Sequence, residues 1–90
     1  MRVLRYEVPV DDMTHTISLS GKVYPFINAP FPHIVEFWAL DSGVPGTDRK
    51  FRVVGTGQTF LSETEDYVHI GTTIYKDKSF RLVWHLFEIK

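Results

Sequence analysis

The last twelve residues of the chain, SFRLVWHLFEIK, constrain the fold more than any other stretch. In an extended strand, successive side chains point to opposite faces. Phe80, Leu82, Trp84 and Leu86 take one face, and Arg81, Val83, His85, Phe87 and Ile89 take the other. An edge strand with one wet face alternates cleanly between apolar and polar residues. Because one face of this segment is wholly apolar and the other is mostly so, we predict a central strand that is covered on both faces.

Alternation between apolar and polar residues predicts six further strands. They span residues 3–10, 15–19, 22–28, 33–40, 49–54 and 67–75. The segment 33–40 is also apolar nearly throughout, which predicts a second central strand. Ser62 and Glu65 have the spacing of a capping box, so the segment 58–66 has room for one short helical turn at most. We therefore predict a single all-β domain, with a small antiparallel sheet of about six to seven strands folded as a barrel or a sandwich.

The connections between these strands depend on prolines and on turn residues. Pro9 cannot donate a ladder hydrogen bond, so the first strand either ends there or lies at a sheet edge. The segment NAPFP, residues 28–32, is expected to be a loop, with Phe31 folded back on the core or else exposed as a contact residue. If Asp77 and Lys78 form a two-residue turn, Trp84 lies opposite Gly71. A four-residue turn of the same parity is the alternative.

Length and composition exclude several classes of protein. Ninety residues suffice for one domain. The absence of cysteine removes disulfides and thiolate metal sites, and it fits a reducing cytosol. Ten basic residues against eleven acidic ones leave no positive excess for non-specific nucleic-acid binding. No apolar run has the length of a signal peptide or a membrane span, so we expect a soluble, cytoplasmic protein that contacts no membrane.

The sequence offers little support for metal binding or catalysis. Regular alternation through the last hairpin puts His69 and His85 on opposite faces, where they cannot share an ion. Asp11, Asp12 and His15 are typical of a solvated turn. No cysteine and no serine in a glycine-flanked elbow is available as a nucleophile. We therefore expect no metal, no cofactor and no enzymatic activity, and we expect His85 to be a satisfied histidine of the core.

One segment suggests the binding of an anion. Gly55, Thr56 and Gly57 resemble a fragment of a phosphate-cradling loop, although the lysine and helix that complete such a loop are missing. The candidate binding residues are Phe31, Arg49, Arg52, Thr56, Gly57, Thr72 and His85. Basic residues beside aromatic ones, as in Lys50-Phe51-Arg52, also suggest a nucleic-acid platform. In a strand, however, that arrangement more simply puts the aromatic ring in the core and the charges in water.

Several stretches together resemble a known group of proteins. They are RVLRYEVPVDD at the start, FWALD at 37–41, FRVVGTGQ at 51–58, YVHIGT at 67–72 and LVWHLFE at 82–88. In order and over nearly the whole chain, these stretches look like a family of small uncharacterised proteins encoded by bacteriophages and prophages, common among phages of actinobacteria. The resemblance implies a phage accessory protein made in the host cytoplasm. It brings no catalytic residues to carry over.

The resulting expectation is a non-enzymatic binding protein whose partner is a host protein. Strands that are apolar on both faces have more apolar surface than one small sheet covers, so we also expect a homo-oligomer. The alternative is a protein that binds or sequesters a small anionic ligand, such as a nucleotide or a signalling molecule. A further alternative is a minor structural component of the virion.

Overall fold

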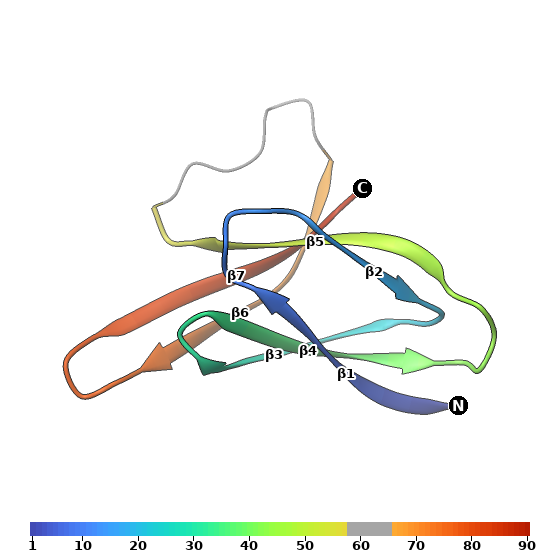
Figure 1. The fold of residues 1–90 in the computed structure, drawn as a ribbon, viewed down its shortest axis with the longest axis horizontal. Helices are drawn as coiled ribbons and strands as arrows, with labels where there is room; N and C mark the ends of the chain where they lie inside the picture. The colour runs from blue at the N-terminus through green and yellow to red at the C-terminus, as the bar shows by residue number, and fades with distance from the viewer. Residues whose placement is uncertain (58–65) are drawn as a thin grey trace.

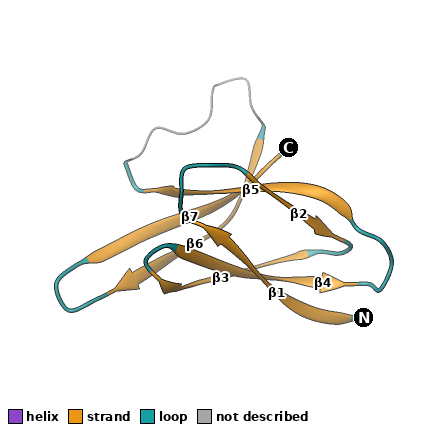
Figure 2. Ribbon diagram, viewed as in Figure 1, coloured by secondary structure: helices purple, strands orange, loops and turns teal. Residues whose placement is uncertain are grey.

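The described residues form seven strands in two antiparallel sheets that pack face to face (Figures 1 and 2). The computed structural model describes residues 1–57 and 66–90. The strands are β1 (Arg2–Pro9), β2 (His15–Leu19), β3 (Val23–Phe31), β4 (Ile34–Asp41), β5 (Thr47–Gly55), β6 (Tyr67–Lys76) and β7 (Arg81–Ile89). The described residues contain no helix, and hence no helix able to cross a membrane. The helical turn considered at 62–65 lies outside the described residues.

The order of the strands in each sheet confirms the two central strands. The three-stranded sheet has the order β1-β4-β3 and the four-stranded sheet has the order β2-β5-β7-β6. Both strands that are apolar nearly throughout, β4 and β7, therefore have a neighbour on each side. Pro9 lies at the end of β1, which is an edge strand, as its missing amide requires. Of the two architectures that the sequence allowed, the described strands form the sandwich.

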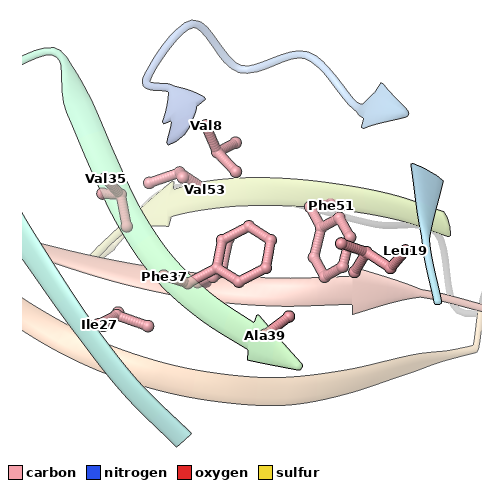
Figure 3. Close-up of a cluster of buried hydrophobic side chains, with 9 residues drawn as sticks. Val8, Leu19, Ile27, Val35, Phe37, Ala39, Phe51 and Val53 are labelled. Atoms are coloured by element: carbon pink, nitrogen blue, oxygen red, sulfur yellow. The ribbon is translucent and has the colours of Figure 1, made fainter. Parts of the chain in front are cut away.

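The core lies between the inner faces of the two sheets (Figure 3). From β4, the side chains of Val35, Phe37 and Ala39 are fully buried. Phe37 meets Phe51 of β5 across the sandwich, with 4.9 Å between the ring centroids. The other buried members of this cluster are Val8, Leu19, Ile27, Val53 and Leu86. A small domain of this kind is stabilised mainly by the apolar area that such a cluster removes from water.

The expectation that β4 and β7 are covered on both faces is wrong. Trp38 and Leu40 on the outer side of β4 are only half-buried, as are Val83 and Phe87 on the outer side of β7. A two-layer sandwich covers only the inner face of each sheet. The apolar residues on the outer faces are shielded only partly, by side chains of the neighbouring strands.

The NAPFP segment is a strand and not the loop that two prolines suggested. β3 continues to Phe31, and the turn to β4 is the two-residue hairpin turn at Pro32 and His33. The prolines are tolerated because β3 is an edge strand whose register with β4 shifts twice. Phe31 is 57% exposed, so of its two expected positions the exposed one is observed and the one folded back on the core is not.

The hairpin of β6 and β7 follows the four-residue alternative and not the two-residue turn. Tyr75 pairs with Leu82 and Thr73 pairs with Trp84, so Trp84 does not lie opposite Gly71. A register shift between His69 and Gly71 then moves the lower part of β6 by one residue. Gly71 approaches β3, since a Cβ there would lie 3.3 Å from side-chain carbons of Ile27. The glycine thus permits close contact between the two sheets along this edge.

Candidate functional site

A row of hydroxyl and imidazole groups crosses the outer face of the four-stranded sheet. Oγ1 of Thr56 lies 2.8 Å from Nε2 of His85. Nδ1 of the same imidazole lies 2.9 Å from Oγ1 of Thr72, which in turn lies 3.0 Å from Nε2 of His69. The four groups therefore form one continuous hydrogen-bonded chain from the end of β5, across β7, to β6. We call it the histidine–threonine chain.

Pairing across the strands positions three of the four side chains. Thr72 of β6 is the register partner of His85, so the two side chains share the outer face. On the other side of β7, Val54 pairs with His85, and Thr56 follows two residues later on the same face. The sequence singled out Thr56, Thr72 and His85 as candidate binding residues, and the structure brings all three together. His85 does not lie in the core but on this half-exposed surface.

His69 is the member that sequence reasoning missed. Regular alternation puts His69 on the face opposite Thr72, but the register shift before Gly71 reverses its direction. The two imidazole rings consequently lie on one face, with 6.2 Å between their centroids, and the prediction of opposite faces is wrong. A glycine inside a strand pattern often marks a bulge. Gly71 was therefore the one available signal.

The histidine–threonine chain has one N–H or O–H donor more than its own hydrogen bonds use, and this spare donor lies at one end. A neutral imidazole donates one hydrogen bond and accepts one, and a hydroxyl donates one. If Nε2–H of His85 donates to Thr56, then Thr72 donates to Nδ1 of His85 and accepts from Nε2–H of His69. In that direction the hydroxyl hydrogen of Thr56 remains available to a ligand. In the opposite direction, Thr56 donates to His85 and the spare donor is Nδ1–H of His69.

Positive charge gathers on the same face, although the whole chain has a net charge of −1. The register places four cationic side chains on the outer face together with His85. They are Lys50 and Arg52 on β5, Lys76 on β6 and Arg81 on β7. Among the described outward residues of β5, Asp48 is the acidic one, at the far end of the strand. The arrangement favours an anionic ligand.

A pocket opens at the Thr56 end of the histidine–threonine chain. It has a volume of about 340 Å³, and the described residues that line it are Gly55, Thr56, Arg81, Leu82, Val83 and Trp84. β5 ends at Gly55, whereas β7 begins at Arg81, so no described strand pairs with residues 81–83 of β7 on the β5 side. The pocket therefore combines a hydroxyl, a cation and an apolar wall.

Two candidate residues serve the structure elsewhere. Arg49 faces inward and donates two hydrogen bonds of 2.6 Å to the carboxylate of Glu88, which is 4% exposed. These hydrogen bonds lower the pKa of Glu88 below its ordinary value. Phe31 stacks on His33 at the β3–β4 turn, in the other sheet. Neither residue belongs to the histidine–threonine chain.

The remaining candidate residues, Gly57 and Arg52, lie near the histidine–threonine chain but are not part of it. Gly57 follows Thr56 and has a φ of 86°, a conformation that glycine adopts readily. Arg52 pairs with Phe87, which is also the partner of His69. Its Nε is buried without a hydrogen-bond acceptor among the described residues.

The turn with Asp11 and His15 forms a pair and not a larger cluster. Nε2 of His15 lies 2.8 Å from Asp11, and this hydrogen bond lowers the pKa of the Asp11 carboxyl. Within residues 1–57 and 66–90, no three histidine, aspartate or glutamate side chains gather as metal ligands would.

The outer face of the three-stranded sheet has a different chemistry. Phe26 is 64% exposed and lies against Trp38, with 5.1 Å between the ring centroids. Val3, which is 51% exposed, and Leu40 pair beside them on the same side. We call this surface, made of Val3, Phe26, Trp38 and Leu40, the aromatic face. It is bordered by Glu36, which accepts a hydrogen bond from Asn28 and has Arg5 at 3.6 Å.

The fold and these two faces define a small two-sheet β-sandwich with open outer surfaces. The chain belongs to the family described as a domain of unknown function, DUF7352, whose model matches residues 1–90. No curated protein and no solved structure matches the chain.

Proposed function

We propose that this chain is a non-enzymatic binding protein that associates with a second copy of itself through the aromatic face. The observation that carries the proposal is the exposed Phe26 ring on Trp38, beside Val3 and Leu40 on the outer face of the three-stranded sheet. Large aromatic side chains dominate the energy of protein interfaces when they become buried. An exposed pair of rings on rigid strands is preorganised for such burial.

The charges at the edge of the aromatic face favour a second copy as the occupant. Arg5 and Glu7 both point outward from β1, on either side of Tyr6. A two-fold interface brings each surface against itself, so its charges must be self-complementary. A two-fold axis near Tyr6 sets Arg5 of one copy against Glu7 of the other.

The size of the face predicts a weak dimer. Three strands of eight or nine residues cover an area of roughly 14 by 27 Å, or about 400 Å². A standard interface buries about 800 Å² from each partner. We therefore expect association at tens to hundreds of micromolar protein, and not a permanent dimer.

Sedimentation velocity over that concentration range tests the proposal. Phe26→Ser should shift the protein toward the monomer, because the exposed ring is lost while the core is untouched. Phe31→Ser is the matched control, since Phe31 is similarly exposed on the same strand but lies outside the aromatic face. A wild-type monomer at every concentration would refute the dimer, as would equal effects of the two substitutions.

The resemblance to phage-encoded accessory proteins extends the proposal to the cellular setting. It supports a protein made in the cytoplasm of an infected bacterium, with a host protein as the target of the dimer. Fractionation of infected cells separates this setting from a structural role in the virion. The chain should remain in the cytoplasmic fraction, and its co-purification with particles would favour the virion component instead.

A second candidate function is the binding of a small anionic ligand on the outer face of the four-stranded sheet. The observation that favours it is the histidine–threonine chain within a cationic surface. The two candidates occupy opposite outer surfaces of the sandwich. One protein can therefore have both.

A further inference from the structure

We infer that the pocket at the end of β5 binds the phosphate group of a small molecule of mononucleotide size, with Thr56 and Arg81 as the groups that hold the phosphate. The inference rests on the second candidate function and assigns a location and a ligand class to it. Its basis is the set of donors that converge on one pocket, the volume of that pocket and the mixed chemistry of its walls.

The first donor is the hydroxyl of Thr56. Its oxygen is held 2.8 Å from Nε2 of His85 and at the same time lines the pocket. When His85 donates to this oxygen, the hydroxyl hydrogen is free to donate to an acceptor in the pocket that Thr56 lines. An anion in the pocket therefore favours the direction of the histidine–threonine chain in which His85 donates to Thr56 and His69 donates to Thr72. His85 is accordingly a positioning residue for Thr56.

Arg81 supplies the charge and a backbone donor. The carbonyl of Val83 accepts a hydrogen bond from the amide of Thr56, so the backbone groups of Val83 point toward β5. In an antiparallel strand this direction recurs at every second residue. The backbone N–H of Arg81 thus faces the side on which β5 has ended. Its guanidinium presents a planar set of donors, the group that proteins most often use for phosphate.

The walls of the pocket determine the size and character of the ligand. Its volume of about 340 Å³ is at the small end of the range for ligand pockets, and it exceeds what a bare phosphate ion fills. Leu82, Val83 and Trp84 form an apolar wall beside the polar groups. A phosphate ester with a flat, partly apolar body fits these features.

Isothermal titration calorimetry on the full chain tests the ligand class. The probes are adenosine 5′-monophosphate, inorganic phosphate, adenosine and a single-stranded oligonucleotide. We expect the mononucleotide to bind more tightly than phosphate, and adenosine to show no binding. Tighter binding of the oligonucleotide per site would overturn the small-molecule class. Equal binding of adenosine and its monophosphate would overturn the role of the phosphate.

Substitutions then test the location. Thr56→Val and Arg81→Gln should each weaken mononucleotide binding about tenfold, because each removes a hydrogen bond to a charged group. Thr56→Ser keeps the hydroxyl and should restore the affinity. Thr16→Val and Lys22→Gln are the matched controls, since Thr16 lies on β2 and Lys22 is an exposed residue just before β3 of the other sheet. The controls should stay within about twofold.

A double-mutant cycle separates the positioning role of His85 from a structural one. His85→Gln should weaken binding in the wild-type background and have no further effect when Thr56 is valine, because His85 acts through that hydroxyl. Additive effects would overturn the role of His85.

The same experiments distinguish a wrong location for the ligand from the absence of anion binding altogether. If the mononucleotide binds but responds to Arg52→Gln and not to the two pocket substitutions, the ligand lies elsewhere on this face. The pocket is then the wrong location, while the anion-binding function stands. If neither phosphate nor the mononucleotide binds at about 1 mM, both are refuted.

Discussion

The outer surfaces of the two sheets have the same construction and opposite chemistry. Each has a central strand that is apolar on its inner side, and each leaves its outer side open. The aromatic face presents Phe26 and Trp38, with Arg5 and Glu36 at its border. The other surface presents two imidazoles linked by Thr72 and flanked by cationic residues. Burial in the core constrains the inner positions and leaves the outer positions free to differ, and it is these outer positions that carry the candidate functions.

The largest expected effect is a loss of stability on substitution in the core, which substitution on an outer surface should not cause. Phe37→Ala should lower the free energy of unfolding by about 3–5 kcal/mol, because Phe37 is fully buried between the sheets. Phe26→Ala should cost less than about 1 kcal/mol, since its ring is mostly exposed. Urea unfolding measures both. Similar losses would show that the aromatic face contributes to stability as the core does, and so is not an open outer surface.

A second effect belongs to the four-stranded sheet alone. Glu88→Gln should lower stability by about 2 kcal/mol at neutral pH, because it weakens two charge-assisted hydrogen bonds from Arg49. Glu36→Gln is the matched control on the three-stranded sheet, where the carboxylate accepts one short hydrogen bond from an amide. Its smaller loss in the same unfolding assay would confirm that the buried ion pair distinguishes the sheets.

The ion pair of Arg49 and Glu88 also makes the stability of the fold depend on pH in the acidic range. The Arg49 guanidinium lowers the pKa of Glu88 below its ordinary value of about 4.5, so the unfolded chain binds this proton more readily than the native one. The stabilisation is therefore present above about pH 4.5 and is lost as the pH falls through the lowered pKa. Glu88→Gln should make the stability curve flatter in that acidic range. An unchanged slope in urea titrations would argue against the pair.

A charge exchange tests whether the aromatic face is self-complementary. Glu7→Arg should weaken the dimer by up to about 1 kcal/mol, because it sets arginine against arginine. Adding Arg5→Glu should recover part of the loss by restoring opposite charges. Sedimentation equilibrium measures both variants. If the double variant is no better than the single one, Arg5 and Glu7 do not meet across a two-fold axis.

The smallest effect concerns the histidine–threonine chain. Thr72→Val should cost less than about 1 kcal/mol of stability, since the lost hydrogen bonds lie on an exposed surface. It should nevertheless change the imidazole nitrogen shifts of both His69 and His85 in NMR spectra. Thr16→Val should leave both unchanged. A change at only one ring would mean that the chain is not continuous in solution.

Local patterns in the sequence specify the elements of this fold. Alternation located the seven strands, and the apolar residues on both faces of β4 and β7 identified these two strands as central. The sequence also drew attention to Thr56, through the likeness of Gly55-Thr56-Gly57 to part of a phosphate-cradling loop, and named Thr72 and His85 as further candidates. The two-residue and the four-residue turn put the same residues of the last hairpin on the same face, so this assignment did not depend on which turn forms.

How those elements combine depends on contacts between strands that are distant in the sequence. The register shift before Gly71 brings His69 to His85, and Gly71 itself approaches Ile27 of β3, more than forty residues away. The prolines of β3 are acceptable only because that strand lies at an edge. Which apolar face becomes the inner one is likewise settled by packing between sheets. Alternation within a strand marks two faces, and only the strand's neighbours determine which of them meets water.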